Sequence, residues 1–232
     1  MRIAIVGDGR MGRAVRATAL SRGHEIVTVV AGRENADGRA LTAERLAGAE
    51  VAVEFTRPEA VMANLDRLSA LGVPVVTGTT GWSGRLDEVR GMVEGRGAAL
   101  LHAANFSLGI QLLYRAAAEL ARALRGRPEF EAHLLERHHK EKRDAPSGTA
   151  LALVQRLRAI DPDRDWPVTS VRSGWVPGTH ALELEGRHES LTLTHTVRDR
   201  AVFAEGAVLA AEWLPGRRGV YTFEDLLSGE AS

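Results

Sequence analysis

The stretch that decides the fold is Met1-Arg2-Ile3-Ala4-Ile5-Val6-Gly7-Asp8-Gly9-Arg10-Met11-Gly12. The apolar run Ile3–Val6 is typical of a buried strand, and a helical pattern follows at Met11–Arg22. The glycines between them have the spacing Gly-x-Gly-x-x-Gly. We expect Gly7 to make the tight turn, Gly9 to let backbone approach a pyrophosphate, and Gly12 to allow close helix–strand packing. This arrangement favours dinucleotide binding, although a purely structural glycine turn shares the spacing.

Strand-like and helix-like segments alternate through the rest of the first hundred or so residues. β-branched apolar runs mark the strands, and helical spacing marks the segments between them. The expected strands are Ile3–Val6, Ile26–Val30, Val51–Phe55, Val73–Thr77 and Ala98–Leu101, and the expected helices are Met11–Arg22, Pro58–Leu71 and Leu86–Glu94. Such alternation predicts a doubly wound parallel sheet that binds ligands outside the carboxyl ends of its strands.

The pattern changes after residue 105. A long helix is expected at Ser107–Leu124, with Ser107 as its N-cap. The further expected elements are a strand at Phe130–Arg137, a helix at Ala150–Ile160, three strands at 168–173, 180–185 and 189–197, a helix at Phe203–Trp213, and a short strand with a helical turn at Gly219–Leu227. Successive strands without helices between them are typical of a mixed or antiparallel sheet. We therefore predict an α/β protein: a Rossmann-type dinucleotide-binding domain at 1–104 and 201–232, with an inserted α+β domain at 105–200.

Composition excludes several classes of protein. The 30 Lys and Arg residues balance 30 Asp and Glu residues, so no net charge attracts nucleic acid or an anionic membrane surface. No apolar run reaches the length of about 18 residues that suggests a membrane span. Absence of cysteine excludes disulfides, thiolate nucleophiles and Cys-ligated zinc. We expect a soluble, cytoplasmic protein with no nucleic-acid or membrane partner.

The end of the second expected strand indicates the cofactor. An acid at this position binds the ribose 2′-hydroxyl of NAD, whereas an arginine accommodates the 2′-phosphate of NADP. The strand ends at Val30 and is followed by Ala31-Gly32-Arg33, with no acid at the tip. Arg33 favours NADPH, while the next residue, Glu34, keeps NADH possible.

Two further segments follow strands on the same edge of the sheet. Gly78-Thr79-Thr80-Gly81 follows the fourth strand, and Ala103-Ala104-Asn105-Phe106 follows the fifth. The first segment by itself is a turn as often as a site, but the two segments together favour a cofactor-lining edge. The expected cofactor-binding residues are Gly7, Asp8, Gly9, Arg10, Met11, Gly12, Arg33, Gly78, Thr79, Thr80, Ala103, Ala104, Asn105 and Phe106.

The densest group of reactive side chains lies at 136–149. Only two of the 30 basic residues are lysines, Lys140 and Lys142, and both lie in Glu136-Arg137-His138-His139-Lys140-Glu141-Lys142. The pKa of a lysine can be tuned and that of an arginine cannot, and histidine exchanges protons near neutral pH. This stretch is therefore a candidate for acid–base chemistry.

The residues that follow this stretch suggest an anion site. Pro146-Ser147-Gly148-Thr149 reads as a helix start, whose free N–H groups and hydroxyls suit a carboxylate. Beside two imidazoles and an ammonium, the site would fit a small dicarboxylate. Two alternatives are a solvated charged loop and a metal site made by Glu136, His138 and His139. We expect no metal, because adjacent histidines rarely reach one ion.

The sequence resembles the 4-hydroxy-tetrahydrodipicolinate reductase (dihydrodipicolinate reductase) family of bacterial diaminopimelate and lysine biosynthesis. The resemblance runs over nearly the whole chain. It is carried by residues 7–12, 54–58, 78–81, 104–107 and, most specifically, 136–150, with Arg172-Ser173-Gly174, Gly178-Thr179-His180, His195, Arg200 and 203–207 adding to it. The sequence differs from the family pattern in a glycine loop one residue shorter, no acid at the second strand tip, and a short 33–50 connection.

The resemblance implies an activity and a role for each matching residue. His138 would be the proton donor/acceptor, Lys142 a proton donor and substrate contact, and His139, Gly148 and Thr149 would bind substrate. The helix-start argument adds Ser147 to the expected substrate-binding residues. Hydride would come from NADPH or NADH, and the inserted domain would bind substrate and assemble a homotetramer. Rival hypotheses are a non-catalytic NAD(P)-binding sensor and a related imine or oxo-acid dehydrogenase.

Overall fold

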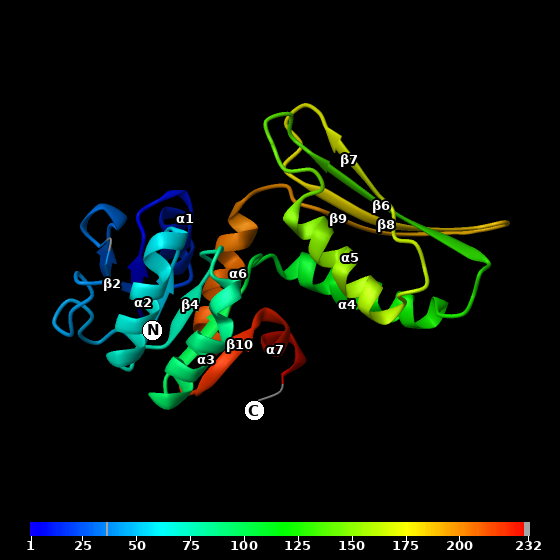
Figure 1. Ribbon diagram of the computed structural model, residues 1–232. Coiled ribbons are helices and arrows are strands. Elements are labelled where there is room, and N and C mark those ends of the chain that lie inside the picture. The colour runs from blue at the N-terminus through cyan, green and yellow to red at the C-terminus, as the bar shows by residue number, and fades with distance from the viewer. Residues whose placement is uncertain (36, 230–232) are drawn as a thin grey trace. The chain divides into compact units, whose positions relative to one another are not determined.

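The computed structural model describes residues 1–35 and 37–229. The chain divides into two compact units, drawn in Figure 1. Unit 1 comprises Met1–Phe106 and Ala201–Ser232, and unit 2 comprises Ser107–Arg200. Among the described residues, no helix combines the length and the apolar character needed to cross a membrane.

Unit 1 is built on a six-stranded sheet in which all paired strands run parallel. Its order is β10-β5-β4-β3-β1-β2. The strands are β1 Arg2–Val6, β2 Glu25–Val30, β3 Val51–Glu54, β4 Val75–Thr77, β5 Ala99–His102 and β10 Gly219–Thr222. The chain runs outward from β1 to β2 and then returns to place β3 on the other side of β1. This reversal of strand order creates the crevice where doubly wound folds bind ligands.

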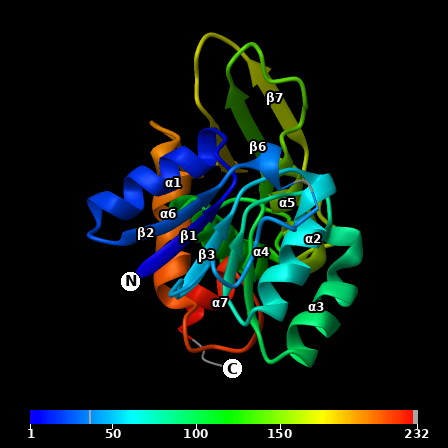
Figure 2. The same cartoon turned by 90° about the vertical axis from the view of Figure 1, so that its left-hand side faces the viewer.

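Helices cover both faces of this sheet, as Figure 2 shows for α1 and α6 on one side and α2 and α3 on the other. Alternate residues of β1 enter the two cores: Ile3 and Ile5 pack in one, and Ala4 and Val6 in the other. This two-sided burial explains the continuous apolar run at the start of the sequence. The elements are α1 Arg10–Ser21, α2 Pro58–Ala70, α3 Leu86–Gly95, α6 Ala201–Trp213 and α7 Phe223–Ser228, with short 3₁₀ turns η1 Gly32–Glu34 and η2 Ser83–Arg85.

Unit 2 is a four-stranded mixed sheet in the order β7-β6-β8-β9. Strand β7 runs parallel to β6, whereas β6–β8 and β8–β9 are antiparallel. Helices α4 Leu108–Leu124 and α5 Gly148–Ile160 contact each other and lie along one face of the sheet (Figure 1). The strands are β6 Phe130–His138, β7 Val168–Arg172, β8 Thr179–Gly186 and β9 Ser190–Thr196.

The predicted fold class is confirmed, and the elements differ from expectation mainly at their ends. Strand β4 begins at Val75 rather than Val73, because Pro74 has no N–H to donate to a neighbouring strand. Helix α5 begins at Gly148, two residues before the expected start at Ala150, since the Ser147 hydroxyl caps it by accepting the Ala150 N–H at 3.2 Å.

Candidate active site

The carboxyl ends of β1, β2 and β3 open on a cleft of about 640 Å³ in unit 1. Gly7, Asp8, Gly9 and Arg33 are among its lining residues. A Cβ on Gly9 would meet nothing within 4 Å, so the loop leaves room for a ligand against its backbone. Gly9 is also the N-cap of α1 and offers no side-chain cap to the first-turn N–H groups. These features fit a bound pyrophosphate.

The other two glycines of the loop are needed for close packing. Gly7 has φ +106°, and a Cβ there would lie 2.1 Å from the Phe55 carbonyl oxygen. A Cβ on Gly12 would lie 1.9 Å from the Gly7 carbonyl oxygen. Any larger residue at either position would therefore push α1 or the end of β3 out of place. Arg10 and Met11 lie between Gly9 and Gly12 in the first turn of α1, and neither residue lines the cleft.

A carboxylate from the loop after β1 lies beside a guanidinium at the tip of β2. Asp8 Oδ1 accepts the Gly32 N–H at 3.4 Å, and Asp8 Oδ2 lies 3.8 Å from Arg33 Nη1. Glu34 is directed elsewhere, because its Oε1 accepts the Ala31 N–H at 3.0 Å and an Arg45 N–H at 2.6 Å. Arg33, and not Glu34, is therefore the side chain that lines the cleft.

The ends of β4 and β5 line a second, smaller hollow of about 140 Å³, to which Thr79, Thr80, Ala103 and Ala104 contribute. Gly78 does not line this hollow, and a Cβ on Gly78 would lie 2.0 Å from the Phe55 ring. The other two expected residues of this edge, Asn105 and Phe106, do not line the hollow. The Phe106 ring is buried between Phe55 and Phe223, at 5.7 Å from each ring centroid.

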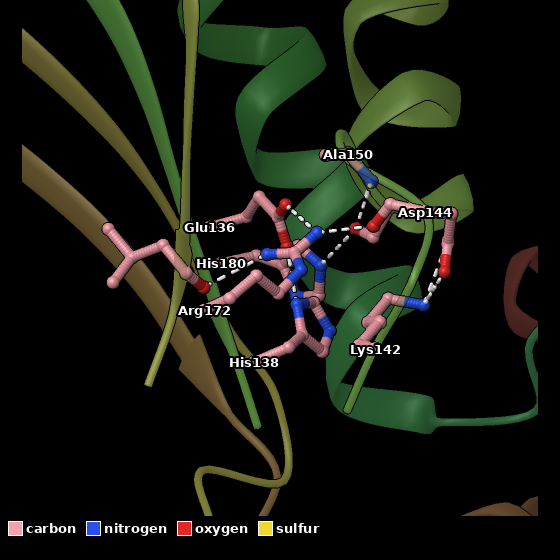
Figure 3. A network of polar contacts seen from close by, with 9 residues as sticks. Glu136, His138, Lys142, Asp144, Ala150, Arg172 and His180 are labelled. Atoms are coloured by element: carbon pink, nitrogen blue, oxygen red, sulfur yellow. Dashed lines mark hydrogen bonds and ion pairs between the residues drawn. The ribbon is translucent and has the colours of Figure 1, made fainter. Parts of the chain in front are cut away.

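In unit 2, strand alternation turns Glu136 and His138 to the same buried face of β6. Figure 3 shows these side chains with their partners from β7 and β8. Glu136 Oε2 accepts a hydrogen bond from His138 Nδ1, and Glu136 Oε1 accepts one from Arg172 Nη2 at 2.6 Å. The imidazole is therefore held by its Nδ1, which leaves Nε2 as the nitrogen available for proton exchange.

Burial and charge have opposite effects on these groups. Burial acts to raise the pKa of Glu136, but the hydrogen bond from Arg172 and the charges of His138 and Arg172 lower it to about 2. Burial lowers the pKa of His138, and the Glu136 carboxylate opposes that fall. Glu136 is thus ionised at neutral pH and supports the protonated imidazole.

His180 connects this group to the start of α5. Its ring lies edge-on to that of His138, with centroids 5.1 Å apart, and its Nε2 lies 3.1 Å from Ser147 Oγ. Burial and the positive charge of His138 lower the pKa of His180 to about 4, so the ring is neutral. Ser147 Oγ already accepts the Ala150 N–H, which leaves its own hydrogen to donate to His180. His180 thereby fixes the cap of the helix whose first residues are Gly148 and Thr149.

Lys142 lies in the turn after β6 and is held by a carboxylate. Its Nζ donates to both oxygens of Asp144, at 2.7 and 2.8 Å, and Asp144 is mainly exposed. The hydrogen bond from Lys142 lowers the pKa of Asp144. His139 is half-buried, and its carbonyl oxygen accepts the Lys142 N–H at 3.1 Å. The ammonium can exchange an exposed partner for a bound carboxylate.

Glu136, His138 and His180 present ligand atoms within 4.8 Å of one another. His139, which the sequence offered as a third metal ligand, follows the last residue of β6 and is not in this group. His180 takes its place, because the sheet register sets His180 opposite Glu136. The Arg172 guanidinium already occupies one oxygen of Glu136, and a cation there would meet its charge. The arrangement suits an anion better than a metal ion.

Sequence reasoning did not assign roles to Arg172 and His180. Both come from strands far along the chain, and the sheet register sets Arg172 beside His138 and His180 opposite Glu136. One signal was available for His180: it alternates with buried Leu182 and Leu184 in β8, so it is a polar residue on the apolar face of a strand. Such a residue needs a buried polar partner.

Comparison with known families decides the relationship of this chain. The family model described as dihydrodipicolinate reductase, N-terminus, matches residues 1–106, and the one described as dihydrodipicolinate reductase, C-terminus, matches residues 109–227. The chain belongs to the dihydrodipicolinate reductase family. The resemblance inferred from the motifs is thus confirmed.

Members of this reductase family align with nearly the whole chain. The 4-hydroxy-tetrahydrodipicolinate reductase of Natronomonas pharaonis is 39% identical over 252 residues, covering 97% of this chain and 99% of the relative. That of Christiangramia forsetii is 33% identical over 239 residues, covering 98% of both. A solved structure, dipicolinate-bound dihydrodipicolinate reductase from Paenisporosarcina sp. TG-14, has the same fold: its TM-score is 0.82 at 22% identity, over 96% of this chain and 97% of the other.

Proposed function

We propose that this protein is an NAD(P)H-dependent 4-hydroxy-tetrahydrodipicolinate reductase, which forms tetrahydrodipicolinate in diaminopimelate and lysine biosynthesis. The observation that carries the proposal is the buried Glu136–His138 pair beside Lys142 and the capped start of α5. An NAD(P)-binding sensor would need the glycine loop of unit 1 but would have no use for this group. Curated relatives that align with nearly the whole chain carry the same activity in their names.

The proposed chemistry needs a proton and fixed positive charge. Loss of water from the substrate gives a conjugated ring, and bound NAD(P)H supplies hydride to it. Negative charge then develops on the ring, and His138 supplies the proton from Nε2 while Glu136 supports its protonated form. Lys142 acts as a second donor and meets a substrate carboxylate, which replaces Asp144 as its partner.

The start of α5 completes the proposed substrate site. Ser147, Gly148 and Thr149 present hydroxyl and first-turn N–H groups that suit a carboxylate. His139, in the turn that carries Lys142, would contact the same substrate. Two carboxylates on one ring would thus find two separate sets of donors, which fits a dicarboxylate substrate.

For the cofactor, we infer that the unit 1 cleft holds the dinucleotide. Gly7, Asp8, Gly9 and Arg33 at the larger cleft would bind its adenosine and phosphates, with Arg10, Met11 and Gly12 supplying the helix start. The second group, Gly78, Thr79, Thr80, Ala103, Ala104, Asn105 and Phe106, would line the nicotinamide end, with Phe106 acting from the core. A preference for NADPH is supported by Arg33 at the cleft and by the diversion of Glu34 to Arg45.

The resemblance to the family also supports a cytoplasmic homotetramer assembled through unit 2. Light scattering on the purified protein should then give four times the chain mass of 25.0 kDa. A monomer at working concentration would contradict this assembly without bearing on the reaction.

Turnover tests the proposed function directly. The purified protein is mixed with freshly made 4-hydroxy-tetrahydrodipicolinate and either NADPH or NADH, and the absorbance of the reduced nicotinamide is followed. We expect substrate-dependent oxidation with at least one cofactor, faster at low concentration with NADPH. If neither cofactor is oxidised while calorimetry still detects cofactor binding, the sensor hypothesis replaces ours. Oxidation only with another imine or oxo acid would point to a related dehydrogenase.

A further inference from the structure

A continuous line of contacts, buried at Glu136 and partly exposed at Arg172, runs behind the proposed proton donor. Arg172 contacts Glu136, and Glu136 contacts His138. Glu136 is 1% exposed, so its charge has almost no access to water. A buried carboxylate is costly unless it is paired and fully hydrogen-bonded. Stability alone therefore does not account for a buried carboxylate in contact with the His138 imidazole.

We propose that Glu136 and Arg172 are positioning residues for His138: the carboxylate holds the imidazole by Nδ1 and keeps Nε2 free for proton transfer, and the guanidinium holds the carboxylate. This inference rests on the proposed function, because it assigns a purpose to the orientation of the proposed proton donor. Neither residue touches the reacting atoms.

Arg172 also links two parts of the site. Besides Glu136, its Nη2 donates to the Asp144 carbonyl oxygen, and its Nη1 donates to the Val171 carbonyl oxygen at 2.9 Å. Asp144 is the residue whose carboxylate holds Lys142. One guanidinium thus fixes the carboxylate behind His138 and the turn that carries the Lys142 partner. A lysine in its place would keep the charge but could not form this fork.

The charges around His138 come from each element packed against it. Glu136 lies on β6, Arg172 on β7 and His180 on β8, and Lys142 lies in the turn after β6. Of these groups, only Glu136 favours the protonated imidazole; Lys142 and Arg172 disfavour it, and His180 is neutral. Removing the charge of Glu136 therefore leaves the effects of burial and of the two cations unopposed.

The experiment replaces the carboxylate by its neutral isostere, Glu136→Gln, and titrates the His138 imidazole by NMR with labelled histidine. We expect the pKa of His138 to fall. Because the protonated imidazole is the donor, the loss of kcat with rising pH should begin at lower pH than in the wild type. At neutral pH kcat should fall about 10-fold or more while KM changes little. This loss is smaller than the roughly 10²- to 10⁴-fold that acid–base catalysis contributes, because the imidazole itself remains.

The matched control is a second Glu–His pair on the same sheet. His133 Nδ1 lies 3.1 Å from Glu183 Oε2, on the opposite face of β6 and β8 from the site. Glu183→Gln removes the same charge from the same kind of pair and should leave both the His138 titration and the kcat profile unchanged.

Further variants separate positioning from folding. Glu136→Asp should restore part of the lost kcat, because it keeps the charge, and Arg172→Lys should give a loss smaller than that of Glu136→Gln. If Glu136→Gln does not fold, Glu136→Asp and Arg172→Lys carry the test through their titrations and pH profiles. Unchanged His138 titration in folded Glu136→Gln would overturn the inference. The titration needs no turnover, so failure of the proposed reaction in the wild type is a separate result.

Discussion

Among the residues that the structure describes, each unit buries one glutamate near the end of a strand, and the two have different partners. Glu54 ends β3 in unit 1 and is fully buried, and Glu136 lies in β6 of unit 2 with 1% exposure. Neutral groups surround Glu54: it accepts hydrogen bonds from Thr77 Oγ1 at 2.6 Å, from Asn64 Nδ2 at 3.2 Å and from the Thr56 hydroxyl. Glu136 instead contacts a guanidinium and an imidazole.

The difference shows that the partners of a buried carboxyl decide its role. The partners of Glu54 come from three places: Thr56 from the loop after β3, Asn64 from α2 and Thr77 from the end of β4. The loops after β3 and β4 are also joined by the Thr56 N–H, which donates to Thr79 Oγ1 at 2.7 Å. Glu54 thus fixes the edge on which the cofactor is proposed to bind. The partners of Glu136 include a group that can exchange protons. Changes in unit 2 should therefore alter kcat, and changes in unit 1 should alter stability or cofactor affinity.

The largest effect on kcat is expected from removing the His138 imidazole. This group is the proton-exchanging partner that Glu136 has and Glu54 lacks. His138→Ala deletes the proposed proton donor, so kcat should fall by about 10² to 10⁴-fold. NADPH affinity, measured by calorimetry, should stay near the wild-type value, because the cleft of unit 1 is untouched. A variant that keeps most of its turnover would refute the role given to His138.

The two lysines offer the next comparison within unit 2. Lys142→Arg keeps a positive charge beside Asp144 but replaces a group whose pKa can be tuned, so kcat should fall about 10-fold or more. Lys140→Arg is the control: Lys140 is exposed and lies over the Trp175 ring at 5.3 Å from its centroid, a contact that arginine keeps. Equal rates for the two variants would place Lys142 outside the chemistry.

Glu54 should respond in stability rather than in rate. Glu54→Gln leaves at least one of its buried hydroxyl or amide donors without an acceptor, which should lower the free energy of unfolding by about 1–3 kcal/mol. Denaturant unfolding measures this loss. At saturating cofactor, kcat per folded molecule should stay close to that of the wild type. A large fall in the kcat of Glu54→Gln would contradict the different roles assigned to Glu54 and Glu136.

The order of elements could be read from the sequence because local patterns determine it. Ile3–Val6 is apolar on both faces, and Gly7, Gly9 and Gly12 carry the spacing of a phosphate-binding turn. The stretch at 136–149 was also recognisable from its residue types. Its partners were not, because Arg172 is 36 residues from Glu136 and reaches it only through the pairing of β7 with β6. Strand order and register are tertiary properties, and no local pattern encodes them.

The smallest effect is expected at the tip of β2, where unit 1 is proposed to select its cofactor. Arg33 is mainly exposed, so its contact with a 2′-phosphate is screened by water and salt. Arg33→Ala should therefore lower the affinity for NADPH by only about 5-fold. The affinity for NADH should stay nearly unchanged, and kcat should be unaltered. Asp8→Asn should act in the opposite direction, because it removes a negative charge next to the phosphate position.

The control for this pair is Arg39→Ala, an exposed arginine of the same segment that pairs with Asp37 at 2.9 Å and does not line the cleft. Arg39→Ala should change neither the affinity for NADPH nor the affinity for NADH. If Arg33→Ala weakens NADPH and NADH equally, the guanidinium contributes only general attraction to phosphate. If Arg33→Ala lowers kcat instead of NADPH affinity, cofactor binding in unit 1 and proton chemistry in unit 2 are not separate. That result would contradict the division of roles that the comparison of Glu54 with Glu136 indicates. The ratio of NADPH affinity to NADH affinity thus tests this division of roles between the units at the position where the expected change is smallest.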